Sequence, residues 1–271
     1  MGIHIPCQAL IASQHRLLSG ALYTPELYTI PANTEENDRV KTDGAKGGGT
    51  RADSIYAGLR RAIIEQALAP GDKLPEDAIG RSFGVSRTLV RGALARLEAE
   101  GLVRLQANRG AEVASPTLEE AADIFEIRRC LELEAVGRLA GRATEADIAR
   151  LEAHLEEEEA AVDGDAARSI RLTGEFHILL AALAGSTVLL GYVSGLVSRC
   201  SLILALYGRP HSAECGVREH RGLIEALRRH DRAAALALMA SHLDDVAGRA
   251  RLTEAGVRQR SIGAILERYA G

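Results

Sequence analysis

The stretch Gly84-Val-Ser-Arg-Thr-Leu-Val-Arg-Gly-Ala-Leu-Ala-Arg-Leu97 decides how the first half of this chain folds. At about 100° per residue, its apolar side chains fall on one arc of a helix and can dock on a small core. The opposite arc carries Arg87, Thr88 and Arg91, with little bulk between them. Such a surface suits the major groove of DNA, where arginine binds guanine through two hydrogen bonds. We call the predicted helix that begins at Arg87 the reading helix, and Ser86 is its expected N-cap, with a hydroxyl able to accept from a first-turn amide.

The flanking segments predict a winged helix-turn-helix around the reading helix. Apolar periodicity over residues 54–69 predicts a helix that stops at Pro70-Gly71, and residues 76–83 predict a short second helix. Gly84 supplies the tight corner between the second helix and the reading helix. After Gly101, residues 102–105 and 111–113 predict a small two-stranded hairpin.

Several segments of this region keep the spacing of one known domain. They are Leu68-Ala-Pro-Gly-Asp-Lys-Leu74, Gly84-Val-Ser-Arg87, Val90-Arg91, Ala93-Leu94, Leu97-Glu98, Glu100-Gly-Leu-Val103 and Asn108-Arg-Gly110. Together they resemble the DNA-binding domain of GntR-family bacterial repressors.

The resemblance implies that Arg87, Thr88 and Arg91 contact a double-stranded DNA operator, and that the wing tip consists of Asn108, Arg109 and Gly110. Some members of the family carry a basic residue just after the glutamate of the second helix. Here that residue is Asp77, so the extra phosphate contact of those members is not expected. The alternative reading is a winged helix used for contacts with another protein.

Composition points to two helical domains without a membrane span. A chain of 271 residues holds about two domains. Its 46% hydrophobic content, with no Trp and three Phe, indicates a core rich in Leu and Ala. The longest apolar run, residues 188–206, is interrupted by Arg199 and is expected to be a buried helix. The N-terminus lacks the pattern of a signal peptide.

The cysteines agree with a reducing compartment. The four of them, at positions 7, 130, 200 and 215, show no paired spacing. The sequence therefore predicts neither a disulfide framework nor a cysteine metal site, and a cytoplasmic protein without a membrane partner is expected.

The charge distribution predicts a homodimer. Residues 51–115 contain 10 Lys or Arg against 8 Asp or Glu, whereas residues 116–271 contain 19 against 24. One domain with so small a basic excess would bind DNA weakly, since neutralised phosphates supply much of the affinity. Two linked copies would gain from effective concentration.

The expected fold class is mainly α, with an N-terminal winged helix-turn-helix followed by an antiparallel all-α bundle of about six helices. Residues 1–50 are polar toward Gly47-Gly-Gly-Thr50 and are expected to form a disordered arm. The DNA-binding domain is placed at 51–115, the effector-binding and dimerisation domain at 116–252, and a C-terminal tail at 253–271. Bundle helices are expected near 117–142, 145–163, 165–184, 187–207, 212–230 and 232–252.

Three histidines are predicted to face the interior of the bundle from three different helices. They are His177, His220 and His242, and each shares a helix face with apolar residues. A buried imidazole needs a hydrogen-bond partner, so one such residue alone is an ordinary core histidine. Three in one bundle favour a divalent metal bound by imidazole nitrogen.

The bundle sequence also resembles a known regulatory module. The matching segments are Asp123-x-x-Glu126-x-Arg128-x-x-x-Glu132, Glu175-Phe-His177, Glu219-His-Arg-Gly-Leu-Ile-Glu-Ala-Leu227 and Met239-Ala-Ser-His-Leu243. They are similar to the FCD effector domain of the FadR subgroup, in which three histidines and an Asp or Asn bind a metal. The resemblance places the histidines at 177, 220 and 242 and the fourth ligand at Thr173, a much poorer donor than a carboxylate. Water or the effector would then complete a zinc or nickel site.

Arg128 lies on the apolar face of its predicted helix and needs an anion there. One reading is an ordinary i,i+4 pair with Glu132. The other reading, which the resemblance favours, is the carboxylate of a small organic acid, so Arg128 is the predicted effector-binding residue. The acidic run 156–159 is expected to be a solvated helix face.

The function predicted from these features is a ligand-responsive transcriptional regulator. We expect a homodimeric repressor that leaves its operator when a small-molecule carboxylate binds near the metal, by a shift between two conformations. No residue is assigned to catalysis. The alternatives are a metal-dependent hydrolase that uses Glu219 as acid or base, and a regulator whose metal is purely structural.

Overall fold

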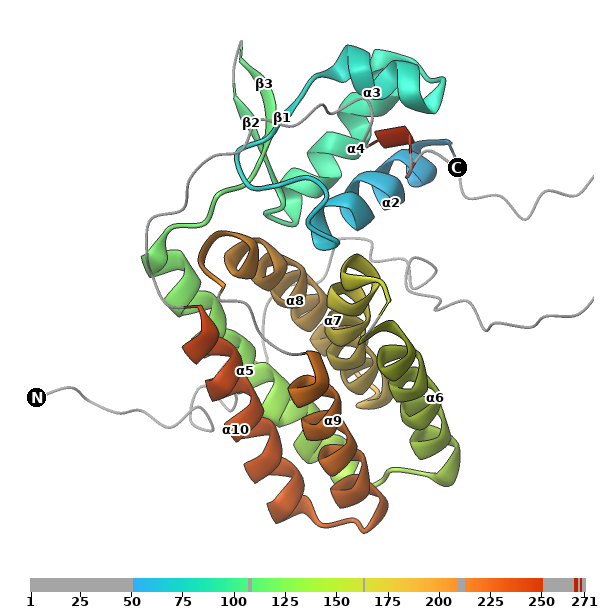
Figure 1. The fold of residues 1–271 in the computed structure, drawn as a ribbon, viewed down its shortest axis with the longest axis vertical. Coiled ribbons are helices and arrows are strands. Elements are labelled where there is room, and N and C mark those ends of the chain that lie inside the picture. The colour runs from blue at the N-terminus through green and yellow to red at the C-terminus, as the bar shows by residue number, and fades with distance from the viewer. Residues whose placement is uncertain are drawn as a thin grey trace, which may run out of the picture. The chain divides into compact units, whose positions relative to one another are not determined.

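The computed structural model describes residues 51–106, 109–162, 164–208, 213–250, 266, 267 and 269. The expected disordered arm, Asn108 and most of the expected tail lie outside the described residues. The predicted fold class is confirmed: a winged helix-turn-helix precedes an antiparallel helical bundle (Figure 1).

Three helices of the winged helix-turn-helix share one apolar core. They are α2 (Arg51–Ile64), α3 (Glu76–Phe83) and α4 (Arg87–Ala99). The reading helix is α4, and the corner before it is Gly84, which has φ 63° and ψ 38°. This left-handed conformation lets the Gly84 N–H close α3 on the carbonyls of Gly80 and Arg81, and it favours glycine because a Cβ would be strained there. The following fully buried side chains make up the centre of this core: Ile55, Leu59, Ile79, Val90, Leu94 and Leu97.

The wing is a three-stranded sheet with the order β1-β3-β2. The predicted hairpin consists of β2 (Val103–Gln106) and β3 (Gly110–Val113), antiparallel with Val103 opposite Val113. The predicted hairpin is confirmed, and the structure adds a third strand that was not predicted, since β1 (Lys73–Leu74) pairs with the other edge of β3. A strand of two residues is too short to show an alternation of apolar and polar residues. Its pairing also depends on a partner more than thirty residues later in the sequence.

Helix caps agree with the sequence in position but differ in chemistry. Ser86 is the N-cap residue of α4, yet its side chain makes no capping hydrogen bond, so that part of the prediction was wrong. Thr117 caps the first bundle helix with a full capping box, because its side chain accepts from Glu120 N–H and the Glu120 carboxylate accepts from Thr117 N–H.

The bundle helices follow the predicted breaks closely. They are α5 (Leu118–Ala140), α6 (Glu145–Val162), α7 (Ala166–Leu183), α8 (Thr187–Tyr207), α9 (Ala213–Arg228) and α10 (Arg232–Arg249). Helix α5 packs against α8 and α10, α6 against α7 and α9, α7 against α8, and α9 against α10.

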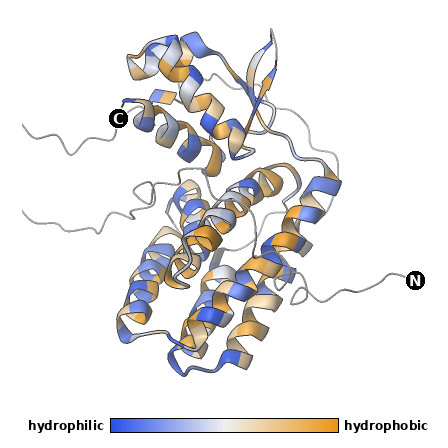
Figure 2. Cartoon of the chain, turned by 180° about the vertical axis from the view of Figure 1, so that it is seen from behind, coloured by the Kyte–Doolittle hydropathy of each residue, from blue (hydrophilic) through white to orange (hydrophobic). Residues whose placement is uncertain are grey.

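A Leu- and Ala-rich core lies inside the bundle, as the composition predicted. Its buried side chains come from α5, α6, α7, α9 and α10, and Figure 2 shows hydrophilic residues spread along the outer faces of these helices. Helix α8 is long and apolar enough to cross a membrane by composition, but half of its apolar window is buried in the protein. That burial is what the sequence predicted for residues 188–206.

One buried carboxylate links three segments of the chain. Glu65, just after α2, is 6% exposed. Its oxygens accept hydrogen bonds from Arg61 at 2.8 Å, from Arg171 of α7 at 3.0 Å and from the Tyr269 hydroxyl at 2.6 Å. Burial raises the pKa of Glu65, but these three donors outweigh burial and leave the pKa below its ordinary value. Helix α7 is thereby tied to the winged helix-turn-helix.

Candidate metal centre and nucleic-acid interface

Three helices bring the predicted histidines together. His177 on α7, His220 on α9 and His242 on α10 are 2%, 1% and 5% exposed. One nitrogen from each ring can be chosen so that the three atoms lie within 4.8 Å of one another. The sequence placed all three on inward faces, and the fold gathers them into one cluster.

Each imidazole of this cluster is held from behind by a glutamate. The Nδ1 atom of His177 lies 2.5 Å from Glu132 of α5, that of His220 3.0 Å from Glu158 of α6, and that of His242 2.6 Å from Glu219. A carboxylate accepts the proton of Nδ1 and so selects the tautomer with a bare Nε2. Glu132 and Glu219, whose pKa values are lowered, therefore direct the Nε2 lone pairs of His177 and His242 toward one another.

The inner nitrogens make the case for a cation. The Nε2 atoms of His177 and His242 lie 3.2 Å apart, and the Nε2 atom of His220 is buried without a hydrogen-bond partner. Two bare lone pairs at that distance repel unless a positive charge lies between them. In a tetrahedral zinc site with Zn–N bonds of about 2.0–2.1 Å, the nitrogens are about 3.3 Å apart. The residues present therefore fit a divalent ion.

Burial also prepares these rings chemically. It lowers the pKa of His177 to about 3, with nearby Arg128 and His242 acting in the same direction against Glu132. Burial likewise holds the pKa of His220 well below its ordinary value, helped by His242 and His154. Both rings are neutral at pH 7, so no proton competes with a metal for their nitrogens.

The fourth metal-ligand position expected from the FCD resemblance is Thr173, which differs in chemistry from the three histidines. Thr173 lies one turn before His177, and its hydroxyl donates to the Ser169 carbonyl at 3.0 Å. The side chain is therefore a neutral group engaged with its own helix, as the sequence led us to expect of a poor donor. Among the described residues, the strong metal-binding groups of this centre are the three imidazoles.

Arg128 finds its anion inside the protein. Arg128 is 4% exposed, and its guanidinium pairs with Glu132, while Cys200 of α8 also accepts from it. Burial raises the pKa of Glu132, but Arg128 and His177 outweigh burial and lower it to about 2. The i,i+4 pair is thus formed, and one carboxylate joins Arg128 to the metal-facing His177. Effector binding by Arg128 stays a prediction.

One sequence prediction at this centre was wrong. Glu158 belongs to the acidic run expected to be solvated, yet it is 2% exposed and faces His220 and His154. Burial raises its pKa to about 8 against the opposing effect of His154 and His242. The signal was available, since Glu158 continues the i, i+3, i+4, i+7 stripe of Leu151, His154 and Leu155.

Arg128→Met is expected to lower the free energy of unfolding by about 3–5 kcal/mol, because it leaves the buried Glu132 carboxylate without its cation. Chemical denaturation with urea measures this loss. The matched control is Arg138→Met on the same helix, whose pair with Glu134 spans 2.8 Å at the surface and should contribute about 1 kcal/mol or less. Equal small losses in the two variants would contradict the proposed importance of the buried pair.

The reading helix presents the predicted residues to solvent. Arg87, Thr88 and Arg91 are all exposed on α4, opposite its buried face. In the wing, Arg109 and Gly110 are exposed at the start of β3, where Gly110 has φ 81°. The geometry agrees with the predicted placement, and contact with DNA stays a prediction.

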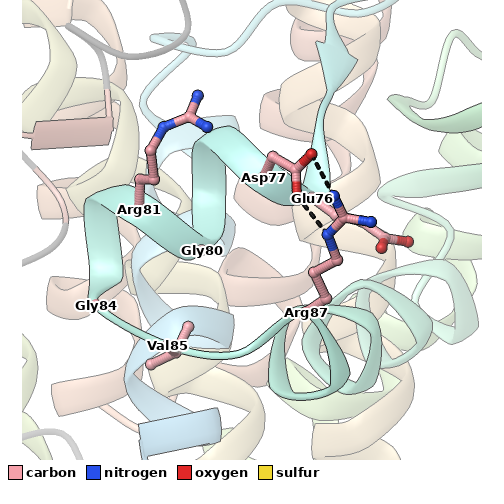
Figure 3. A pocket seen from close by; sticks show the side chains of 7 residues that line it. All are labelled: Glu76, Asp77, Gly80, Arg81, Gly84, Val85 and Arg87. Atoms are coloured by element: carbon pink, nitrogen blue, oxygen red, sulfur yellow. Dashed lines mark hydrogen bonds and ion pairs between the residues drawn. The ribbon is translucent and has the colours of Figure 1, made fainter.

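Two acidic residues of α3 contact the arginines of the reading helix, which no local sequence pattern predicted. Arg87 reaches Asp77 at 2.5 and 2.7 Å, and Arg91 reaches Glu76 at 2.8 and 2.9 Å. Figure 3 shows Arg87 extending from the start of α4 toward Asp77, while Arg81 points away from that pair. A pocket of about 280 Å³ lies here, lined by α3 and the turn into α4. Asp77, where the resemblance led us to expect no phosphate contact, thus pairs with an arginine of the reading helix.

Comparison with known proteins agrees with this architecture. Residues 51–113 match the model described as bacterial regulatory proteins, gntR family, and residues 123–245 match the FCD domain. The HTH-type transcriptional regulator YdhC of Bacillus subtilis is 31% identical over 195 residues, which cover 70% of this chain and 86% of YdhC. The chain belongs to the GntR family. This GntR-family protein is a DNA-binding transcriptional regulator with an FCD domain.

Further relatives place the GntR-family chain among bacterial regulators. It is 27% identical over 194 residues to the HTH-type transcriptional repressor RspR of Escherichia coli, covering 71% of this chain and 85% of RspR. Among solved structures, E. coli McbR/YncC aligns with a TM-score of 0.66 and 24% identity, over 73% of this chain and 95% of that one. A GntR regulator from Rhodococcus aligns with a TM-score of 0.65 and 24% identity, over 74% and 97%. These two likenesses bear on the fold alone.

Proposed function

We propose that this GntR-family protein is a cytoplasmic homodimeric repressor whose reading helix enters the major groove of a palindromic operator. The observation that carries this proposal is the exposed face of α4, where Arg87, Thr88 and Arg91 project from a helix packed on its opposite side. Arginine recognises guanine in the major groove, and threonine can reach a phosphate or a base. The exposed Arg109 and Gly110, with Asn108, would contact DNA from the wing.

Dimerisation follows from the charge of the DNA-binding segment. Its 10 basic residues face 8 acidic ones, and both arginines of the reading face are paired with carboxylates. A single copy would therefore neutralise few phosphates and bind weakly at physiological salt. We assign DNA binding to residues 51–115, and effector binding and dimerisation to residues 116–252.

The helical part would sense a small organic acid close to a bound metal ion. His177, His220 and His242 would hold the ion, zinc or nickel, and their glutamate partners would keep the rings oriented. The bound ion supplies a positive centre that a carboxylate can ligate. Thr173 is a weak metal ligand, which favours a coordination position of the metal that water or the effector can occupy. Arg128 is the proposed second contact of the effector. The effector carboxylate would replace Glu132 as the partner of the Arg128 guanidinium.

Helix α7 offers a route from this centre to the reading helix. It carries His177 at the metal centre and Arg171, whose guanidinium lies 3.0 Å from Glu65 beside α2. An effector can shift the protein between two arrangements only by its different affinity for them. A coupling of about 1–3 kcal/mol changes operator affinity by about 5- to 150-fold, which is sufficient for regulation.

The test is selection of operator DNA from a random duplex library with the full chain, followed by release with small carboxylates. We expect enrichment of one palindromic sequence, and release by at least one compound from a panel of mono-, di- and tricarboxylates when the protein is metal-loaded. Absence of any enriched sequence would refute the repressor. Enrichment without release by any carboxylate would refute the proposed effector class and favour a structural metal.

A metal-dependent hydrolase is the second candidate, because three imidazoles with an open position also describe catalytic zinc. Its proposed acid or base, Glu219, lies on the Nδ1 side of His242 and accepts that proton. The hydrogen bond from His242 is the main cause that lowers the pKa of Glu219. Turnover of ester or amide substrates that disappears in Glu219→Gln would favour this candidate over the repressor.

A further inference from the structure

The two ion pairs on the reading helix use one edge of each guanidinium. Arg87 contacts Asp77 through its Nε atom at 2.5 Å and through Nη2 at 2.7 Å. Arg91 contacts both oxygens of Glu76 through Nε, at 2.8 and 2.9 Å. Both acids come from the first turn of α3, so the two arginines are bound by the same end of the same helix.

Within the part of the chain that the structure describes, these pairs leave the outer ends of the two arginines without a partner. A guanidinium has five N–H donors in a rigid fork. The contact to Asp77 takes the Nε–H and one Nη2–H of Arg87, and the contact to Glu76 takes the Nε–H of Arg91. No described residue contacts the Nη1 group of Arg87 or Arg91, and the two side chains are 66% and 70% exposed. Bidentate recognition of guanine O6 and N7 uses these free ends.

We propose that Asp77 and Glu76 are positioning residues that hold Arg87 and Arg91 in the geometry required to read guanine. This inference rests on the proposed function of α4 as the reading helix. A free arginine loses rotamer freedom when it binds a base, and a side chain already held by a neighbouring helix loses less. The acids also cancel the charge of the two arginines, which weakens sequence-independent attraction to phosphate. Both effects increase discrimination between operator and other DNA.

The opposite role would be masking, in which the acids simply compete with DNA for the arginines. Masking and positioning predict different responses to the loss of one carboxylate. If Asp77 only masks Arg87, then Asp77→Asn strengthens binding to every duplex by the same factor. If Asp77 positions Arg87, then the variant gains affinity for unrelated DNA through its extra positive charge but loses part of its guanine recognition. The ratio of the two affinities therefore separates the two roles.

The matched control is Asp53→Asn, which changes the charge of the same domain by the same amount. Asp53 pairs with Arg96 of α4 at 2.7 Å, and Arg96 also lies over the Tyr56 ring, away from the reading face. Asp53→Asn should therefore show the effect of the added positive charge on DNA affinity without any effect on the position of Arg87. Asp77→Glu keeps a carboxylate beside Arg87 and serves as the conservative variant.

The experiment compares binding of two duplexes by the full chain: the sequence selected by the wild type, and the same sequence with its guanines replaced by adenine. Asp77→Asn is expected to lower the ratio of the two affinities about 10-fold. The salt slope on the guanine-free duplex is expected to become steeper by about one per reading helix. Asp53→Asn should keep the wild-type ratio, and Asp77→Glu should recover most of it. Thermal unfolding checks that all variants are folded.

An unchanged ratio in Asp77→Asn, with equally tighter binding to both duplexes, would overturn the positioning role in favour of masking. An equal fall of the ratio in Asp53→Asn would overturn it as well, because net charge alone would then explain the result. If the wild type fails to distinguish the two duplexes, the reading function of α4 fails and this inference with it. Failure of the inference alone is seen when the wild type discriminates and Asp77→Asn discriminates equally.

Discussion

Replacement of both Arg87 and Arg91 by alanine is expected to abolish operator binding while leaving thermal stability nearly unchanged. Each guanine-reading arginine contributes about 1–3 kcal/mol of discrimination. A dimer loses four of them, so affinity should fall on the order of 10³-fold or more. Stability should change little, because both side chains are exposed and surface ion pairs contribute about 0–1 kcal/mol.

A gel-shift titration and a thermal melt of the same preparations measure these two effects. The control removes two other surface arginines, Arg138 and Arg168, which form exposed pairs with Glu134 and Glu157 in the bundle. That double variant has the same change in net charge and should keep operator affinity. Wild-type affinity in the Arg87/Arg91 variant would show that α4 does not read the operator.

His220→Ala is expected to remove the bound metal and the stabilisation that the metal provides. The ring contributes one of the three inward nitrogens, and its loss leaves two imidazoles, which bind divalent ions far more weakly. A ligand present at about 1,000 times its Kd stabilises the folded state by about 4 kcal/mol. The wild type should therefore unfold at a lower temperature after treatment with a chelator, whereas the variant should show no such shift.

Elemental analysis of the purified proteins gives the metal content directly. Part of the stability lost in His220→Ala has another origin, because Phe176 stacks on this ring at 3.8 Å. The shift caused by the chelator is therefore the diagnostic measurement. His230→Asn is the control, since His230 is exposed and its positive φ of 52° is one that asparagine tolerates. If wild-type protein holds no metal and takes up none on titration with zinc or nickel, the metal centre is refuted.

The helices and their inward faces could be predicted because their causes are local. Apolar spacing placed Val90, Leu94 and Leu97 inward and Arg87 and Arg91 outward, and the structure agrees. Glycine, proline and capping residues end or begin a helix within about one turn of their own position. The boundaries and order of the bundle helices could therefore also be predicted from the sequence. The inward faces of His177, His220 and His242 follow from the same periodicity.

The partners of those residues were decided by the tertiary structure. Glu132 and Glu158 lie 45 and 62 residues from the histidines they hold, and which side chains meet across the bundle depends on helix packing that periodicity does not encode. From the sequence, Asp77 was interpreted only as the absence of a phosphate contact. Its pairing with Arg87 is seen only in the structure, where α3 packs against α4. The sequence thus determined which side chains face inward or outward on each helix. Only the packing of helix against helix determined which carboxylate each cation or imidazole receives, because hydrogen bonds and ion pairs form between atoms that the fold brings within about 3 Å.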